Sequence, residues 1–498
     1  MSEEITPIVA VGRNCWRIER ASHASVIVDA ADYYRVIAEA MERAQERIFI
    51  VGWDFDTRIS LAPDREGSYH ASLGHFFLEL ARKKPGRKID ILKWNFGALK
   101  QFLSLRATYW LIRWWIARPI NLKFDSSHPK GCSHHQKIVV IDESLAACGG
   151  IDIAMRRWDT REHKPDDPCR KTPNGHPYEP WHDTTMLMKG DVAEALGELG
   201  RERWKVATSR DLDPVKQIDD DWPENLDPMF EDADIAIART RAAWNDVEEV
   251  RENEALVIDM IEKCERFAYI ENQYFTSPRI AAAICTRLSE PNPPEIVMVM
   301  PRTADGWLES VAMDGTRQRL MQTIQKNPGG ENFRIYVPVN EAGTDIYVHA
   351  KLAVIDDRFL RVGSANLNNR SMGLDSECDV IVDCGLPQNR NRGFEEVIRD
   401  QRRDLMAEHL DCDIAEIERL ENEGKGLIDT IEKLRGEGKT LTLLELKDLS
   451  DAENFISDHE LLDPESTEEM LEPFARKSLR QRWRERRARL KKRFSRSS

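Results

Sequence analysis

Three features that would assign a chain of 498 residues to a membrane or secreted class are missing from this sequence. It has no run of 18 apolar residues, and three arginines interrupt its most apolar segment, 103–120. Its first twelve residues lack the basic start and the apolar stretch of a secretory signal. Its nine cysteines include no CxxC pair, which disfavours a disulfide framework or a structural zinc site. The sequence therefore predicts a cytoplasmic protein with free thiols.

Basic residues are outnumbered by acidic ones, except at one end of the chain. There are 87 acidic and 72 basic residues, a net charge of −15, and a protein that binds nucleic acid with its whole surface is normally basic. We therefore expect no nucleic-acid partner. Residues 476–498 nevertheless hold twelve Lys or Arg and one Glu, a charge of +11 that leaves −26 on residues 1–475.

The basic tail, residues 476–498, has the pattern of an amphipathic helix. Its large apolar residues share one side of a helical wheel: Leu479, Trp483, Leu490 and Phe494. This composition favours binding to an anionic membrane surface, and we expect peripheral attachment to the inner face of the membrane. A solvated tail, a contact with the acidic body and nonspecific nucleic-acid binding are the alternatives.

The rest of the chain contains two copies of one α/β pattern. In each copy an amphipathic helix pattern precedes a short apolar strand, and two further apolar strands follow. The paired segments are 31–46 and 247–265, 46–51 and 265–270, 89–95 and 295–300, and 135–142 and 349–356. Near-constant offsets in the same order predict two similar α/β repeats, with sheets flanked by helices.

Composition places the boundaries between these parts. A stretch rich in Asp and Pro separates the two halves, and after residue 412 the chain becomes acidic and helix-prone with glycine-containing breaks. The predicted parts are a first half at 1–208, a linker at 209–232, a second half at 233–412, an acidic helical appendage at 413–475, and the basic tail.

Each repeat carries the motif His-x-Lys-x4-Asp. Alternate side chains of a strand share a face, so the histidine and the lysine of each motif point the same way. The aspartate has the opposite parity, which favours a structural or turn role over contact with substrate. One such motif is weak evidence, but two copies inside a duplicated unit are strong. The predicted catalytic residues are His135, Lys137, Asp142, His349, Lys351 and Asp356.

A glycine-led turn follows each motif, Gly149-Gly150-Ile151-Asp152 in the first half and Gly363-Ser364-Ala365-Asn366 in the second. Such turns offer backbone N–H groups and small polar side chains to phosphate oxygens. Because an anionic aspartate would repel a phosphate, the serine and the asparagine are the stronger candidates. The predicted substrate-binding residues are Ser364, Asn366, Gly149, Gly150 and Asp152.

These motifs resemble those of the phospholipase D superfamily, and the resemblance to its eukaryotic-type members is wider still. It extends to Pro180-Trp181-His182-Asp183, to the strand Ile270-Glu271-Asn272-Gln273-Tyr274-Phe275, and to the run from Gly363 to Ser371. It covers about residues 10–412. The resemblance implies the phospholipase D fold with the active site at the interface of the two halves, here followed by a helical C-terminal extension.

The resemblance also implies a chemistry. One histidine attacks phosphorus, the other protonates the leaving oxygen, and the lysines with Ser364 and Asn366 neutralise the phosphate. By family analogy His135 is the nucleophile and His349 the general acid, although the residues alone do not break that symmetry. Asp183 and Glu377 are expected to orient the imidazoles, with neither assigned to one histidine, and His182 is expected to line the site.

The resulting expectation is an enzyme that hydrolyses the distal phosphodiester of glycerophospholipids to phosphatidate and free head group. Transphosphatidylation would follow when an alcohol replaces water. The expected partner is a phospholipid, and no metal or cofactor is expected. The alternatives are a cardiolipin-synthase-like phosphatidyltransferase and a nuclease or other phosphodiesterase on the same fold. Two complete motifs argue against a catalytically silent lipid-binding protein.

Overall fold

The computed structural model describes residues 6–65, 72–94, 113–114, 120–218, 221–304, 307–446 and 463. In the first half, the strands are β1 (Arg17–Val28), β2 (Arg47–Gly52), β3 (Lys88–Trp94), β4 (Ile120–Asp125), β5 (Ile138–Ile141), β6 (Leu145–Gly149), β7 (Trp181–His182) and β8 (Thr184–Lys189). Its helices are α1 (Ala30–Arg43), α2 (Leu73–Lys83) and α5 (Asp191–Thr208).

The second half repeats this arrangement. Its strands are β9 (Phe230–Arg241), β10 (Val250–Arg251), β11 (Phe267–Asn272), β12 (Glu295–Val299), β13 (Phe333–Val339), β14 (Tyr347–Val348), β15 (Lys351–Ile355), β16 (Phe359–Gly363), β17 (Glu377–Asp383) and β18 (Thr440–Leu443). Its helices are α6 (Glu252–Glu262), α7 (Pro278–Leu288), α8 (Trp307–Lys326), α9 (Asn369–Gly373), α10 (Phe394–Leu410), α11 (Ile414–Asn422) and α12 (Leu427–Leu434).

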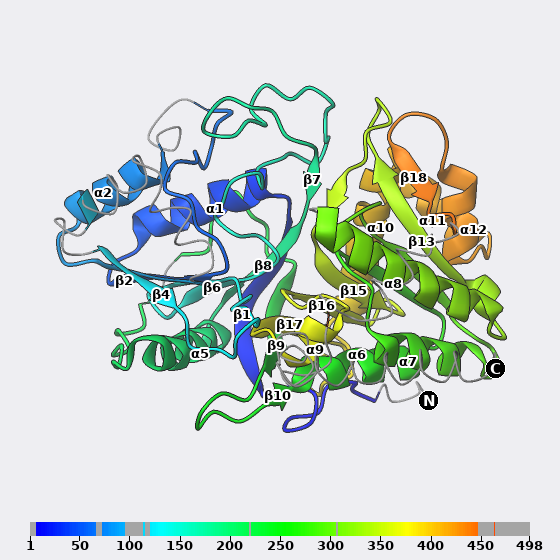
Figure 1. Cartoon of the computed structure of the whole chain (residues 1–498), viewed down its shortest axis with the longest axis horizontal. Helices are drawn as coiled ribbons and strands as arrows, with labels where there is room; N and C mark the ends of the chain where they lie inside the picture. The colour runs from blue at the N-terminus through cyan, green and yellow to red at the C-terminus, as the bar shows by residue number, and fades with distance from the viewer. Residues whose placement is uncertain are drawn as a thin grey trace, which may run out of the picture.

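Within the described residues, one sheet of sixteen strands joins the two halves, which lie side by side in Figure 1, and β10 joins it by pairing with β9. Its centre is the antiparallel pair β1–β9. Outward from that pair the order is β8-β6-β5-β2-β3-β4 on one side and β17-β16-β15-β11-β12-β13 on the other. In both directions the inner pairs are antiparallel, and the strands β2 to β4 and β11 to β13 are parallel. The last strand of the second half, β18, pairs antiparallel with β13. The predicted α/β class and its duplication are confirmed.

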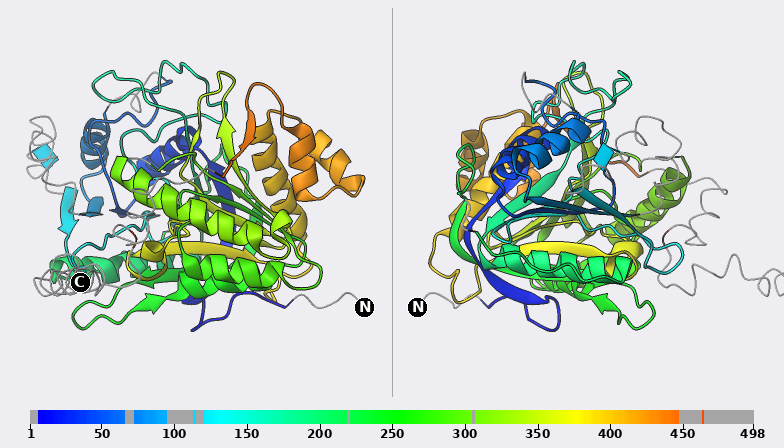
Figure 2. Two further views of the ribbon diagram at one scale, coloured as in Figure 1. Left: turned by 45° about the vertical axis from the view of Figure 1, so that its right-hand side comes forward. Right: turned by 90° about the vertical axis from the view of Figure 1, so that its left-hand side faces the viewer.

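Side-chain alternation explains why helices cover both faces of this sheet. Along β2, Ile48 and Ile50 belong to the core under α1 and α2, whereas Phe49 and Val51 belong to the core that includes α5. Gly200 lets α5 approach closely, because a Cβ at that position would collide with the Phe49 ring. Figure 2 shows the helices on the two sides of the sheet.

Residues 413–446 are integrated into the second half, although the sequence suggested a separate appendage from 413 to 475. β18 extends the sheet by pairing antiparallel with β13, with Leu443 opposite Tyr336. Ile417 and Ile431, from α11 and α12, complete the core beneath α10. The basic tail lies outside the described residues. Among the described helices, none is long and apolar enough to cross a membrane.

Candidate active site

Each motif histidine lies at a place where the two halves pair with each other. The backbone N–H of His135 donates to the carbonyl of Ser376 at 2.9 Å, and that of His349 donates to the carbonyl of His182 at 2.7 Å. The duplication makes these contacts equivalent, because Ser376 precedes β17 and His182 precedes β8. Each histidine therefore lies beside the acidic residue that follows its partner in the opposite half.

Those acidic residues hold the imidazoles crosswise. His135 Nδ1 lies 2.9 Å from Glu377 Oε2, and His349 Nδ1 lies 2.7 Å from Asp183 Oδ2. A carboxylate accepts a hydrogen bond from Nδ1–H, which leaves Nε2 of each ring unprotonated in the neutral tautomer. The geometry thus assigns one carboxylate to each histidine, a choice that the sequence left open.

Each motif lysine lies next to its histidine. Lys137 Nζ donates to the His135 carbonyl at 3.0 Å and lies 3.2 Å from Asp152 Oδ2. Lys351 Nζ donates to the His349 carbonyl and, at 3.1 Å, to the side-chain oxygen of Gln273. Both ammonium groups are therefore held at the histidine end of their strands, where a phosphate bound between the halves would meet them.

Three further residues of this site were not singled out from the sequence as site residues. Trp53 and Gln273 occupy equivalent positions directly after β2 and β11, and the Trp53 ring centroid lies 5.9 Å from Lys137 Nζ. The Arg157 guanidinium lies 4.2 Å from the centroid of the Trp181 ring, which itself stands 5.0 Å from the ring of His349. The sequence pattern pairs residues 46–51 with 265–270, an offset of 219 residues. In the structure β2 corresponds to β11 at an offset of 220, and this register pairs Trp53 with Gln273.

Burial and nearby cations keep both imidazoles neutral. Burial lowers the pKa of His135 well below its usual value, and Lys137 and Lys351 lower it further. Burial likewise lowers the pKa of His349, with Lys351 and Arg157 adding to the effect. A neutral imidazole is the form that attacks phosphorus, so the free site holds two histidines in the nucleophilic state.

The groups around the histidines titrate near neutral pH. Burial raises the pKa of Glu377 to about 7 and that of Asp183 to about 6, although hydrogen-bond donors and lysines oppose the shift. Burial lowers the pKa of Lys351 to about 7. Small changes in local charge, such as the arrival of a phosphate anion, can therefore move protons within this site.

The second glycine turn contributes polar groups directly. Ser364 Oγ donates to Glu377 Oε2 at 2.6 Å, the same oxygen that faces His135. Asn366 is buried, and its side-chain oxygen has no hydrogen-bond partner among the described residues. These contacts place Ser364 at the His135–Glu377 pair, and on Asn366 the amide nitrogen is the group that can donate to a phosphate oxygen.

The first glycine turn is built differently. A Cβ on Gly150 would collide with the Asp183 carboxylate, and one on Gly149 would collide with Thr185. Asp152 accepts from the backbone N–H of Trp53 at 3.1 Å besides pairing with Lys137. Gly150 therefore lies against the carboxylate that holds His349, and Asp152 holds Lys137. The predicted contact of Gly149, Gly150 and Asp152 with substrate stays a prediction.

The motif aspartates lie at the far ends of their strands from the histidines. The carboxylate of Asp142 accepts from three successive backbone N–H groups, Gln45 to Arg47, at 2.5–2.7 Å. The carboxylate of Asp356 does the same for Glu265, Arg266 and Phe267 at 2.7–2.9 Å. Although both were grouped with the catalytic residues, they hold the chain at the start of β2 and β11.

His182 also differs from its expected place. It is fully buried, and its ring nitrogens face Glu271 at 2.8 Å and Glu408 at 3.0 Å. His182 therefore lies behind the site, because the next residue, Asp183, makes the contact with His349.

Replacing Asp356 with alanine should lower stability and spare catalysis. Three backbone N–H groups would lose a charged acceptor, and we expect a loss of roughly 3 kcal/mol in the free energy of unfolding. We expect kcat per folded molecule to change by less than about twofold, since no reacting group is touched. Denaturant unfolding and turnover corrected for the folded fraction would check this. A loss of kcat without a loss of stability would contradict the structural role.

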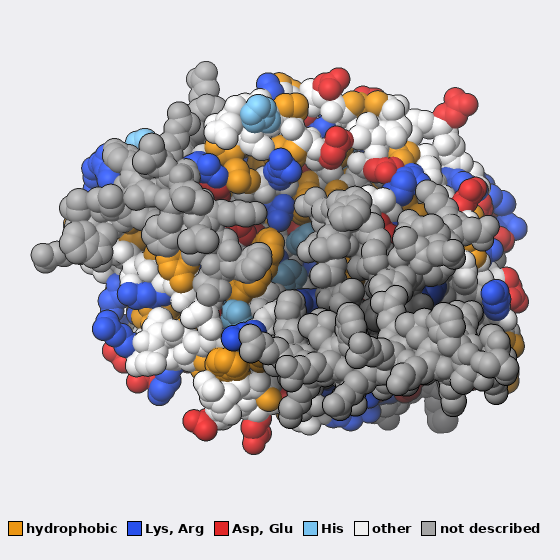
Figure 3. Space-filling model, viewed as in Figure 1, with side chains coloured by type: hydrophobic (Ala, Val, Ile, Leu, Met, Phe, Trp, Pro, Cys, Tyr) orange, Lys and Arg blue, Asp and Glu red, His pale blue; other side chains and the backbone are white. Residues whose placement is uncertain are grey.

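Histidine side chains lie at the bottom of a hollow near the middle of the face drawn in Figure 3, with lysine or arginine side chains beside them. The arrangement therefore offers a concave surface with two neutral imidazoles and several cations, which matches the needs of a reaction at an anionic phosphodiester.

The chain is similar to known proteins over most of its length. A family model described as "Cardiolipin synthase, PLD-like domain" matches residues 257–395. Phospholipase D1 of Saccharomyces cerevisiae is 25% identical over 89% of this chain, and phospholipase D alpha 1 of Nicotiana tabacum is 25% identical over 75% of it. These alignments cover 32% of the yeast protein and 63% of the tobacco protein, so the chain spans only part of its relatives.

Among solved structures, a phosphatidylserine synthase from Haemophilus influenzae superposes with a TM-score of 0.52 at 14% identity. The alignment covers 78% of this chain and 88% of that one. At this identity the match describes a shared fold.

Proposed function

We propose that this chain, which belongs to the phospholipase D superfamily, hydrolyses the distal phosphodiester of glycerophospholipids to phosphatidate and free head group through a covalent phosphohistidine. The observation that carries the proposal is the crosswise pairing of two neutral histidines with buried carboxylates, at 2.9 Å and 2.7 Å. The relatives named phospholipase D support the choice of a lipid phosphodiester over other phosphodiesters.

The first step uses both histidines. Lys137, Lys351 and the amide of Asn366 hold the phosphate oxygens and reduce the repulsion that an anion presents to a nucleophile. Nearby cations lower the pKa of His349 in the free site. The negative charge of the bound phosphate offsets those cations, so it raises the pKa of His349 and favours the imidazolium form. His135 Nε2 then attacks phosphorus, the bond from phosphorus to the head-group oxygen breaks, and His349 gives that oxygen its proton.

The second step reverses the roles. Neutral His349 takes a proton from water, the water oxygen attacks phosphorus, and the phosphorus–nitrogen bond to His135 breaks. Phosphatidate leaves, and both imidazoles are neutral again once His349 has released the proton. An alcohol that replaces the water gives transphosphatidylation. His135 is drawn as the nucleophile by analogy with the family, and its side chain is also the more exposed of the two, 13% against 7% for that of His349.

A product assay tests the proposal. Purified protein is incubated with vesicles of phosphatidylcholine, phosphatidylethanolamine or phosphatidylglycerol, or with single-stranded DNA, with and without ethanol. We expect phosphatidate without ethanol and phosphatidylethanol with it. Conversion of phosphatidylglycerol to cardiolipin alone would indicate a phosphatidyltransferase, and cleavage of DNA without lipid turnover would indicate a nuclease. Either result would overturn the proposal.

The pH profile of kcat/KM should be a narrow bell. Above about pH 7 the free enzyme loses the charge of Lys351, so kcat/KM should fall by up to about tenfold per pH unit. On the acid side, protonation of Glu377 below about pH 7 and of Asp183 below about pH 6 removes the charges that orient the imidazoles.

Initial rates on a soluble phosphodiester between pH 5 and 9 would show this bell. Bound phosphate should hold the proton of Lys351, so the basic limb of kcat should lie at higher pH than that of kcat/KM. Lys351→Arg should lose the basic limb. A profile that stays flat up to pH 9 would contradict the role of Lys351.

We further propose that the basic tail attaches the enzyme to the inner face of the cytoplasmic membrane, a role supported by its composition. Deleting residues 476–498 should weaken sedimentation with vesicles that contain anionic lipid and leave turnover of a soluble substrate unchanged. Each basic residue near the surface contributes roughly 1 kcal/mol, so the loss should be large and salt-dependent. Unchanged sedimentation would refute this role.

A further inference from the structure

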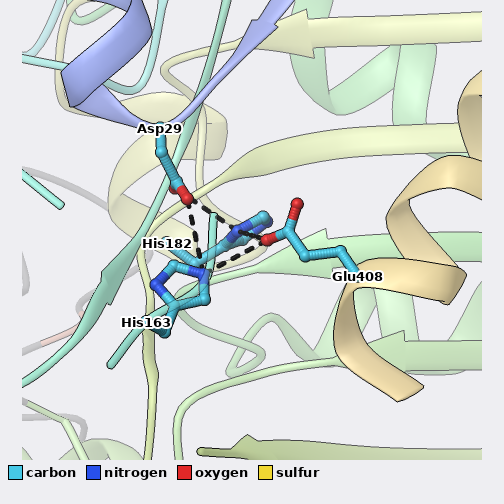
Figure 4. A group of neighbouring side chains, drawn as sticks. All are labelled: Asp29, His163, His182 and Glu408. Atoms are coloured by element: carbon cyan, nitrogen blue, oxygen red, sulfur yellow. Dashed lines mark hydrogen bonds and ion pairs between the residues drawn. The ribbon is translucent and has the colours of Figure 1, made fainter. Parts of the chain in front are cut away.

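Four side chains from distant parts of the chain converge behind the active site (Figure 4). Asp29 precedes α1, His163 lies in the loop before β7, His182 is in β7, and Glu408 is in α10. One ligand-type atom from each lies within 4.8 Å of the corresponding atoms of the other three. We call these four residues the His–carboxylate cluster. Its members come from both halves of the molecule.

The nitrogen–oxygen distances suit a tetrahedral metal ion, with one oxygen of the Asp29 carboxylate facing each histidine. His163 Nε2 lies 3.4 Å from Asp29 Oδ2 and 3.1 Å from Glu408 Oε1. His182 Nδ1 lies 3.4 Å from Asp29 Oδ1 and 3.0 Å from Glu408 Oε1. Bonds of about 2.0–2.1 Å from zinc to nitrogen and oxygen require ligand atoms roughly 3.3 Å apart at tetrahedral angles.

The other ring nitrogen of each histidine is held by a carboxylate outside the cluster. His163 Nδ1 lies 3.1 Å from Asp159 Oδ2, and His182 Nε2 lies 2.8 Å from Glu271 Oε2. Histidines that bind metals usually donate their second N–H to a carboxylate in this way, which fixes the tautomer and turns the free nitrogen toward the ion. The arrangement therefore leaves Nε2 of His163 and Nδ1 of His182 facing the centre of the cluster.

Two cluster atoms make no hydrogen bond of good geometry among the described residues, although each has a histidine nitrogen or a carboxylate oxygen of the cluster within 3.4 Å. They are Asp29 Oδ2 and His182 Nδ1, and both side chains are at least 99% buried. A buried polar atom without a hydrogen bond is costly, so its persistence needs an explanation such as a bound ion.

The charges around the cluster also favour a bound cation. Asp29, Glu408, Asp159 and Glu271 bring four carboxylates into a buried region. Two guanidinium groups reach it, since Arg170 pairs with Asp159 at 3.0 Å and Arg161 pairs with Glu408. Arg161 is also paired with Asp404 at 2.7 Å, so with neutral histidines at least two negative charges are left over, and a divalent cation would offset them.

We propose that Asp29, His163, His182 and Glu408 bind one divalent transition-metal ion, with Zn²⁺ as the best match to two imidazole and two carboxylate ligands. No metal was expected from the sequence, because ligands at short spacing are the local signal of a metal site and these ligands are distributed from residue 29 to residue 408.

The ion would hold a structural element of the active site. The backbone N–H of Asp183 donates to Asp29 Oδ1 at 3.0 Å, and the N–H of Asp29 donates to the carbonyl of Asp183 at 2.8 Å. Asp183 in turn orients His349. A metal at the cluster would therefore fix Asp183 from behind and tie α10 of the second half to β7 of the first. It would take no part in the chemistry at phosphorus.

The cluster borders a surface cavity through Glu408. An open cavity of about 820 Å³ reaches Glu408. Its charged lining includes Arg161, Lys164, Glu341, Asp404, Glu408 and Lys439. Rotation of the Glu408 side chain would give an ion access from this cavity without unfolding either half.

Metal analysis of the purified full-length protein tests the proposal. Protein from zinc-supplemented cultures is dialysed against metal-free buffer, and its metal content is measured by mass spectrometry. We expect about one equivalent of zinc per chain. His163→Gln and Asp29→Asn should each reduce this at least about fivefold, while His176→Gln, a matched change of an exposed histidine in the same loop, should keep the full equivalent.

A second measurement on the unmodified chain keeps the proposal falsifiable if those variants fold poorly. Stripping the ion with a chelator should lower Tm by about 5 °C or more, and added Zn²⁺ should restore it. Co²⁺ in place of zinc should give the visible absorption of a tetrahedral site. A zinc content below about a tenth of an equivalent per chain, both before and after incubation with excess zinc, would overturn the proposal. The charges of Asp29 and Glu408 would then be balanced by protonated His163 and His182. These readouts do not depend on lipid turnover, so they separate this proposal from the proposed function.

Discussion

Alanine at either motif histidine should reduce phospholipid turnover by about 10⁴-fold or more, because each ring acts in both chemical steps. His135→Ala removes the atom that bonds to phosphorus, and His349→Ala removes the proton donor. The exposed variant His176→Ala should behave as the unmodified chain. Turnover of vesicle lipid, with Tm to verify folding, measures this, and near-normal turnover by either variant would contradict the two-histidine mechanism.

A substrate with a p-nitrophenolate leaving group distinguishes the two histidines. This group departs without a proton, so His349→Ala should regain the first step and release a burst of p-nitrophenol. The second step would stay slow because no base activates water, and an acid-labile phosphoryl group should accumulate on His135. His135→Ala should remain inactive with this substrate. The reverse pattern would show that His349 is the nucleophile.

The fold could be predicted from the sequence because its signals are local and occur twice. Apolar strand patterns of the first half, such as 46–51, recur in the second half at a nearly constant offset and in the same order. Two such repeats predict that the strands of each half follow the same order outward from the centre of the sheet, as the structure shows. The addition of β18 could not be predicted. Residues 440–443 form a short strand that is recognised only by its pairing with β13, more than one hundred residues earlier.

The assignment of carboxylates to histidines depends on contacts that no local pattern encodes. His135 and Glu377 are 242 residues apart, and His349 and Asp183 are 166 apart. Each pair forms because the residues before β5 and β15 pair with the opposite half. The His–carboxylate cluster lay beyond sequence reasoning for the same reason, since Asp29 and Glu408 meet only in the folded molecule.

Removing the charge of either carboxylate should cost about 10²–10⁴-fold in kcat, because an amide neither fixes the tautomer nor stabilises an imidazolium. The variants are Asp183→Asn and Glu377→Gln, which keep the shape of each side chain. Both are buried beside a histidine, so the loss should appear in kcat more than in KM. Glu396→Gln, an exposed change on α10, is the control and should leave kcat unaltered.

The two carboxylate variants should also differ from each other. Asp183 supports His349, the proton donor of the first step. Because p-nitrophenolate leaves without a proton, the Asp183→Asn variant should carry out the first step with the p-nitrophenyl substrate. Glu377 supports His135, and Glu377→Gln should stay slow with either leaving group because the nucleophile itself is misplaced. Burst amplitudes measured with the two substrates give this comparison. Equal burst amplitudes in the two variants would contradict this assignment. They would mean that Asp183 does not act only through His349, nor Glu377 only through His135.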